Sequence, residues 1–313
     1  MADAQLAEIE TESVRTVLVA LTANLGIAAA KLGAALVTGS SAVLAESFHA
    51  LADSGNQVLL LVAQRQSRVP PDERHPLGHG RVAYFWALIA SLAVFVTGAL
   101  LSFRQGIEEL LHPAPAKSFG AAYLVLLVSF CLESISLRRA YRQIKSEART
   151  LSRDFLEHLD MTSDPIARAV FAEDAAAVLG NLIAAAGLGL QQLTGSSIPD
   201  AVAALLIGAI LSFVAFQLAR HNGDFLIGRQ ASVDIQSRIG AIIAAKPGIV
   251  AVQELVVIFL GPRQLWIVAR IGIEATLTGA RVEQMLAETA CALEDESPFI
   301  SRIDLVPAKR WVP

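Results

Sequence analysis

Six long apolar segments fill most of the chain before residue 224 and set its fold class. Each approaches the roughly 20 residues that an α-helix needs to cross a bilayer. The chain is 54% hydrophobic and only 17% charged, and its mean hydropathy of +0.53 is too high for an ordinary soluble enzyme. The sequence therefore predicts an all-α membrane bundle over residues 14–223, after a polar tail at 1–13. The six predicted helices lie at about 14–38, 42–64, 82–107, 118–138, 166–191 and 199–221.

Positive charge is concentrated in two of the links between these segments. The link after the second segment and the link after the fourth segment are rich in arginine, whereas the other three links have few positive charges. Links that carry Lys and Arg stay on the cytoplasmic side, and an even number of helices then places both termini there. We expect an integral protein of the bacterial inner (cytoplasmic) membrane, in contact with lipid; in an organelle the matrix side would be equivalent.

A second domain is expected at residues 224–313, where the apolar segments end. Its pattern predicts a helix–strand–strand–helix–strand order, which describes a small cytoplasmic α+β domain of the ferredoxin-like, metallochaperone-like kind. A domain of this size is marginally stable alone, so we expect it to pair with a second copy in a homodimer. The expected helices lie at 233–245 and 279–296, and the expected strands at 249–260, 264–274 and 299–306.

Charge and cysteine usage argue against several functional classes. The net charge is −4 and no basic domain stands out, so we expect no nucleic-acid partner. Cys131 and Cys291 are the two cysteines of the chain, and their separation provides neither a disulfide framework nor a Cys-based zinc site. No GxxxxGK(S/T) nucleotide motif and no HExxH metalloprotease motif occurs. We therefore expect no enzyme activity and no bound cofactor.

A polar stripe interrupts the second apolar segment. Glu46, His49 and Asp53 are three and four residues apart, which places them on one face of a helix. Ionisable side chains are costly in a bilayer and mark ion pathways. An imidazole and a carboxylate one turn apart also suit a first-row divalent metal. The structural alternative is a buried His–Asp pair that only joins helices.

Further motifs accompany this stripe along the chain. They include the run at 41–49, the loop HPLGHGR at 75–81 and the run FAEDAAAVLG at 171–180. With six helices and an α+β tail, they resemble the cation diffusion facilitator family of metal/proton antiporters, and most of all the branch with the animal mitochondrial zinc exporter. The resemblance implies a homodimeric secondary transporter that exports a divalent metal, zinc first, in exchange for protons. Mn²⁺, Fe²⁺ and Co²⁺ stay open as alternative cargo, and no cofactor beyond the transported metal is implied.

The resemblance also implies a tetrahedral transport site built from two helices. Carried over onto this sequence, its ligands are His49, Asp53 and Asp174. The remaining family position, four residues before Asp174, is Val170, which cannot bind metal. Glu173 is a tentative replacement. Because neighbouring helical side chains point about 100° apart, we expect Glu173 to complete the site only if its helix is distorted or rotated.

Polar residues near this predicted site have more than one interpretation. Glu46 is expected beside the ligands rather than among them. Asn24 and Asn56 are expected to form hydrogen bonds between helices, with a contact to the site as the alternative for Asn56.

A second, peripheral candidate site lies in the loop after the second segment. Asp72, His75 and His79 match a zinc site of some family members, whereas the alternative is a solvated loop that binds no metal.

Two other functions of the protein also remain open from the sequence. They are a membrane-embedded metalloenzyme that uses the same His and Asp residues, and a metal sensor whose tail binds partners.

Overall fold

The structure is a computed structural model that describes residues 21–22, 24–113, 119–150, 154–297 and 299–308. The predicted tail at 1–13 and the start of the first apolar segment at 14–20 lie outside the described residues. The chain forms two compact units. The first comprises Met1–Ala63, Trp86–His158 and Ile166–His221, and the second comprises Gln64–Phe85, Leu159–Pro165 and Asn222–Pro313.

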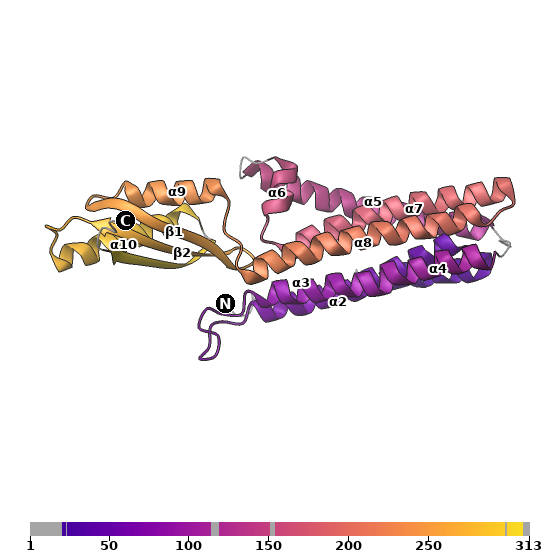
Figure 1. Ribbon diagram of the computed structural model, residues 1–313, viewed down its shortest axis with the longest axis horizontal. Helices are drawn as coiled ribbons and strands as arrows, with labels where there is room; N and C mark the ends of the chain where they lie inside the picture. The colour runs from indigo at the N-terminus through magenta and orange to yellow at the C-terminus, as the bar shows by residue number, and fades with distance from the viewer. Residues whose placement is uncertain (1–20, 23, 114–118, 151–153, 298, 309–313) are drawn as a thin grey trace, which may run out of the picture. The chain divides into compact units, whose positions relative to one another are not determined.

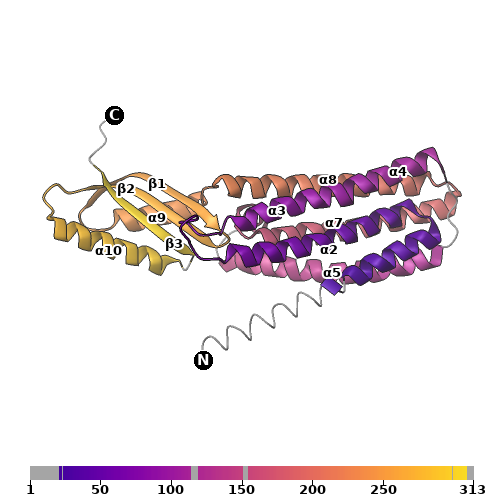
Figure 2. The ribbon, with the colours of Figure 1, turned by 90° about the horizontal axis from the view of Figure 1, so that it is seen from below.

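The first unit consists of helices that run along one another, as both views of the ribbon show (Figure 1, Figure 2). A helix at Asn24–Thr38, called here the first helix, precedes the labelled elements. A π-helix, which the sequence pattern did not predict, joins α3 and α4 into one continuous rod. The labelled helices are α2 (Ser41–Ser67), α3 (Val82–Ala93), η1 (Val94–Leu100), α4 (Leu101–Leu111), α5 (Phe119–Thr150), α6 (Phe155–Met161), α7 (Pro165–Thr194) and α8 (Ile198–Ile227).

Four helical stretches in the described part of the chain are long and apolar enough to cross a membrane. They are Val82–Leu111, Phe119–Arg149, Pro165–Thr194 and Ile198–Ile227. Helix α2 is 27 residues long, but the polar residues of its central turns lower its mean hydropathy. The first helix is shorter in its described part. A helical membrane domain is therefore confirmed, and six crossings remain a proposal.

The core of the first unit is made mainly of alanine, with a few larger aliphatic side chains. Small side chains let helix backbones approach closely, which is how helices associate where lipid removes the hydrophobic driving force. Gly187 of α7 shows how close the approach is, because a Cβ atom added there would lie 2.6 Å from the Cβ of Ala203 on α8. The tight packing fixes the polar face of α2 against its neighbouring helices.

The second unit contains a three-stranded sheet with strand order β1-β2-β3. Strand β1 (Ile249–Gly261) pairs antiparallel with β2 (Gln264–Ile273), and β3 (Ile300–Ala308) pairs parallel with β2. Helices α9 (Val233–Ala244) and α10 (Gly279–Glu296) contribute to the core of this unit. This order confirms the predicted small α+β domain.

Alternation along β2 explains which face of the sheet is buried. Leu265, Ile267, Ala269 and Ile271 are buried, and successive side chains of a strand point to opposite faces. This face packs with buried residues of α9 and α10 such as Ile243 and Met285 in one hydrophobic core. The turn between β1 and β2 includes Arg263 with φ of 56°, the one non-glycine residue with positive φ among those described.

Candidate functional site

A cavity of about 100 Å³ lies among the helices of the first unit. A cavity of this volume has room for a metal ion with bound water. His49 and Asp53 line it from α2, and Glu173 and Asp174 line it from α7. The structure therefore places all four predicted intramembrane ligands around one cavity. The other lining residues are Asn24, Ile27, Ala50, Gln57, Leu132, Glu133, Ser136, Val170 and Ala177.

Neutral side chains hold two carboxylates that line the cavity from α2 and α7. Asp53 lies 3.4 Å from the side-chain amide nitrogen of Asn24, which donates to it from the first helix. The hydroxyl of Ser136 on α5 donates to an oxygen of Asp174 over 2.7 Å. Donors of this kind orient metal-binding carboxylates without adding charge, and they are a common feature of metal sites.

Glu173 is held from α2 by an amide. The Nδ2 atom of Asn56 lies 2.6 Å from each of the two Glu173 carboxylate oxygens, and both residues are buried. Asn56 thus forms the predicted hydrogen bond between helices, and through Glu173 it also contacts the cavity lining.

Helix α7 presents Glu173 and Asp174 to the same cavity without interruption of its α-helical conformation. The two side chains diverge, as adjacent helical residues must, but α7 has partners on both sides. Glu173 reaches Asn56 on α2, and Asp174 reaches Ser136 on α5. Both side chains therefore line the cavity from a regular helix, and the role of Glu173 as a metal ligand stays a prediction. Val170 lines the cavity one turn earlier.

His49 is buried without hydrogen-bond partners. Its side chain is 3% exposed, and neither ring nitrogen has a hydrogen-bond partner among the described residues. Its Nδ1 atom is 3.9 Å from Glu46 Oε1, which is too far for a hydrogen bond. Leaving buried polar atoms unpaired costs about 1–3 kcal/mol per group, and a metal ion in the cavity would relieve this cost for the one ring nitrogen that carries a lone pair.

A buried charge network beside the cavity was missed by the sequence analysis. Lys31 of the first helix is 0% exposed, and its Nζ atom lies 2.8 Å from Glu46 Oε2 and 2.9 Å from Glu133 Oε1. Asn181 of α7 donates to the other oxygen of Glu133. Lys31 and Glu133 are ionisable residues inside apolar segments, so the rule that singled out His49 could also have found them.

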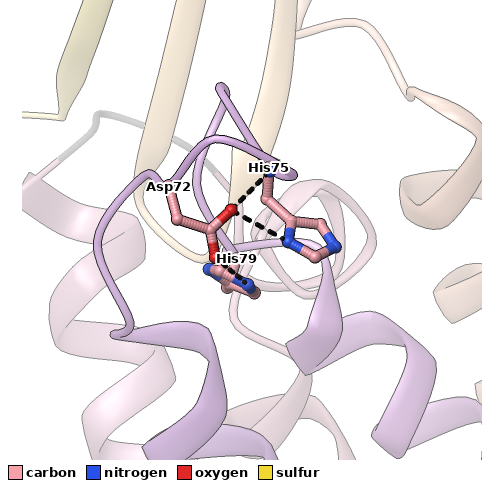
Figure 3. A group of neighbouring side chains, drawn as sticks. All are labelled: Asp72, His75 and His79. Atoms are coloured by element: carbon pink, nitrogen blue, oxygen red, sulfur yellow. Dashed lines mark hydrogen bonds and ion pairs between the residues drawn. The ribbon is translucent and has the colours of Figure 1, made fainter.

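The peripheral loop brings its three predicted residues together in the second unit (Figure 3). Asp72 Oδ1 is 3.2 Å from His75 Nδ1, and Asp72 Oδ2 is 3.6 Å from His79 Nε2. One ligand atom of each residue lies within 4.8 Å of the others, and no other group of three His, Cys, Asp or Glu residues in the described ranges meets this limit. Two imidazoles and a carboxylate are ligands that suit Zn²⁺.

Backbone hydrogen bonds shape this loop and tune its carboxylate. Asp72 Oδ1 accepts the backbone N–H of His75 at 2.6 Å and that of Arg74 at 2.9 Å. The hydrogen bond from the His75 backbone, with the smaller contribution from Arg74, lowers the pKa of Asp72 below its ordinary value of 3.8. Asp72 is therefore ionised at neutral pH, which is the state that a metal ligand requires.

Comparison with known proteins gives a consistent set of relatives. "Proton-coupled zinc antiporter SLC30A9, mitochondrial" of Xenopus laevis is 36% identical over 225 residues, which cover 72% of this chain and 40% of that protein. "Metal tolerance protein C4" of Arabidopsis thaliana is 32% identical, with 74% of this chain and 50% of that protein covered. "Cation-efflux pump FieF" of Klebsiella pneumoniae is 28% identical, with 70% and 67% covered.

The alignments are partial for the more similar of these relatives, since the matched region is 40% to 50% of their own length. Among solved structures, a cadmium form of the MamM CTD is 20% identical and covers 25% of this chain and 95% of that chain, with a TM-score of 0.23.

The helical part of the chain matches a family model over most of its length. Residues 17–227 match the model described as the cation efflux transmembrane domain. This range contains the cavity, its ligand candidates and the peripheral loop. The protein is an integral membrane protein, and the chain belongs to the cation efflux, or cation diffusion facilitator, family.

Proposed function

We propose that the protein is a secondary transporter that exports a divalent metal, most simply Zn²⁺, from the cytoplasm in exchange for protons. The observation that carries the proposal is the cavity among the helices that is lined by His49, Asp53, Glu173 and Asp174. The names of the relatives support it, because they include proton-coupled zinc antiporters and cation efflux pumps. A cation efflux domain is a transport domain, which argues against the alternative of a metalloenzyme. Mn²⁺, Fe²⁺ and Co²⁺ are the alternative cargo.

The exchange mechanism follows from the ligand chemistry of the cavity. A metal binds neutral imidazole and ionised carboxylates, so metal and protons compete for the same atoms of His49, Asp53 and Asp174. Protons release the metal when the cavity opens to the side with more protons, and metal displaces protons when it opens to the cytoplasm. Alternate opening around one fixed site is the usual behaviour of secondary transporters.

The proposal includes the membrane arrangement. Helix α2 and the first helix, together with the four apolar stretches, make six crossings, and both termini then lie in the cytoplasm. We place the protein in the bacterial inner membrane, with residues 14–223 as the membrane domain and 224–313 as the cytoplasmic domain. The positive-inside rule supports this topology, because arginines cluster at 65–81 and 138–153.

The decisive test is flux through the purified protein in sealed liposomes. Zn²⁺, Mn²⁺, Fe²⁺ and Co²⁺ are offered one at a time, with and without an imposed pH gradient, and a dye reports internal pH. We expect zinc uptake to be faster when the liposome interior is more acidic than the outside. Protons should then leave the liposomes as zinc enters. Metal uptake that does not change with the pH gradient would show that the protein is not a proton antiporter. The absence of flux for all four metals would favour the sensor alternative.

We propose that the loop of Asp72, His75 and His79 binds a second metal ion. Asp72→Ala removes one ligand and the acceptor of two backbone hydrogen bonds, so loop affinity for zinc is expected to fall at least about tenfold. The neighbouring exposed acid gives the matched control Glu73→Ala. Zinc titration of the full-length protein by calorimetry checks the prediction, and an equal loss in both variants would show only a general effect of charge.

The dependence of this loop on pH has a definite sign. Because the folded-state pKa of Asp72 is lowered, its contribution to loop order is complete above the ordinary value of 3.8 and is lost as the pH falls through the lowered value. Acidification below neutral pH therefore leaves the Asp72 turn intact until the pH falls below about 4. Any loss of loop zinc at milder pH has to come from another ligand.

We propose that the C-terminal domain pairs two copies of the chain without a histidine-bound metal. All six histidines lie at or before residue 221, so the domain offers a metal only carboxylates and Cys291. The mass of the full-length protein in detergent is therefore expected to be that of a dimer both before and after treatment with a strong chelator. Light scattering coupled to size exclusion measures this mass, and a monomer after chelation would show that a metal bridges the copies.

A further inference from the structure

We propose that Lys31 is a positioning residue of the transport cavity: its ammonium group holds the Glu133 carboxylate away from the transported metal. The inference deepens the proposed function and rests on it, since it assumes that the cavity binds the cargo. It predicts that Lys31 determines which carboxylate oxygens coordinate the metal, and therefore which metals the cavity binds.

The first observation is that both oxygens of Glu133 are already engaged. One oxygen lies 2.9 Å from Lys31 Nζ, and the other accepts a hydrogen bond from the side-chain amide of Asn181. Glu133 also lines the cavity, where its side chain is 14% exposed. The Glu133 carboxylate is thus oriented by two donors that do not line the cavity, and a metal that approached its remaining lone pairs would also approach the positive charge of Lys31.

The second observation is that Lys31 stands outside the cavity lining. Its side chain is fully buried, and its Nζ atom bridges Glu46 and Glu133. Glu46 is also fully buried and does not line the cavity. Of the two carboxylates bound to Lys31, only Glu133 can therefore reach a metal there. Glu46 and Glu133 carry the same charge and bind the same lysine, but only Glu133 lines the cavity. Comparing substitutions of these two residues therefore tests the inference.

The charge of the network explains why the protein needs the lysine. Two buried carboxylates and one ammonium group carry a net charge of −1, and without Lys31 the charge would be −2. A buried ion pair that loses one partner leaves an uncompensated charge, which is strongly destabilising. A divalent cation entering the cavity would then be drawn to Glu133 in compensation.

Selectivity follows from the kind of ligand that Glu133 would add. Imidazole suits Zn²⁺, whereas each added carboxylate favours harder cations such as Mn²⁺. The cavity already offers the carboxylates of Asp53, Glu173 and Asp174 beside a single imidazole. Because Lys31 keeps the Glu133 carboxylate away from the metal, no further oxygen ligand is added beside the single imidazole nitrogen of His49.

The test compares variants by equilibrium binding of Zn²⁺ and Mn²⁺ to full-length protein in detergent. A background with both Asp72→Ala and His75→Ala removes two of the three loop ligands, so that binding reports the cavity. Lys31→Met is combined separately with Glu46→Gln and with Glu133→Gln, which gives two double variants with the same net charge as this parent protein. Lys145→Met, a lysine of α5 that contacts Tyr141 and lies outside the network, controls for loss of a positive charge.

We expect Lys31→Met to raise the affinity for Mn²⁺ relative to Zn²⁺ by about tenfold, the lower end of the effect of residues that orient metal ligands. The gain should persist in Lys31→Met/Glu46→Gln, where Glu133 keeps its charge but has lost its ammonium partner, and disappear in Lys31→Met/Glu133→Gln. If Lys31→Met alone does not fold, the two double variants are compared directly.

Three results would overturn the inference. Equal metal preference in the two double variants would show that only net charge matters, and failure of all three variants to fold would show a purely structural lysine. A ratio unchanged from the parent protein in Lys31→Met would show that Glu133 never reaches the metal. If the parent protein binds neither metal in the cavity, the proposed function fails instead, so the two failures are distinguishable.

Discussion

Replacing Asp53 by alanine is expected to reduce metal flux into liposomes to the background of protein-free vesicles. Asp53 lines the cavity from α2, and its described hydrogen bonds are long, at 3.4 Å to Asn24 and 3.5 Å to Gln57. Such weak contacts are a poor reason to keep a carboxylate among apolar helices, where ionisable groups are costly and mark ion pathways. The loss should exceed the roughly 10- to 100-fold typical of residues that only support a metal ligand.

Asp53→Asn separates the ligand role from a structural one. Asparagine keeps the shape of the side chain and an oxygen that accepts a hydrogen bond, but it removes the negative charge that binds metal and protons. Both substitutions are therefore expected to abolish flux while the protein elutes as folded protein in detergent. His49→Ala should behave in the same way. Flux near wild type in Asp53→Asn would identify a polar cluster that only joins helices.

The elements that sequence reasoning located well depend on local signals. In the C-terminal domain, the turn residues Pro262 and Arg263 separate runs rich in Val and Ile, and the observed strands and helices agree with the expected ones within two residues. The spacing of His49 and Asp53 on α2 and the motif around Asp174 likewise predicted which side chains share a face. The cavity brings these residues together.

The parts that sequence reasoning missed depend on which helices are neighbours. Lys31 meets Glu133 across 102 positions of the chain, and no spacing within one helix indicates such a contact. The partners of Glu173 and Asp174 are also on other helices, since Asn56 of α2 binds Glu173 and Ser136 of α5 binds Asp174. Residue spacing within α7 does not indicate either contact. The π-helix η1 and the short α6 also have no clear sequence pattern.

Substitution of Val170 by histidine is expected to tighten zinc binding and narrow the range of transported metals. Val170 lines the cavity from α7, four residues before Asp174 and therefore almost directly above or below it on the helix. A histidine there would add a second imidazole to the site. Two imidazoles with Asp53 and Asp174 provide the four ligands of a tetrahedral zinc site, and nitrogen favours Zn²⁺ over harder cations. We expect a gain of about tenfold in zinc affinity, by analogy with the effects of metal-site residues.

Glu173→Gln tests the other way in which the site could be completed. Asn56 donates to both Glu173 oxygens at 2.6 Å, and glutamine keeps one acceptor for that hydrogen bond but loses the charge. If Glu173 binds the metal or carries a proton, flux should fall by at least about tenfold; if it only joins α7 to α2, the loss should be small. Val170→Leu is the matched control for Val170→His, because leucine also adds volume at the cavity wall but cannot bind a metal. The assignment fails if Val170→His leaves affinity and metal preference unchanged while Glu173→Gln transports normally, because α7 would then not present its ligands to the cargo.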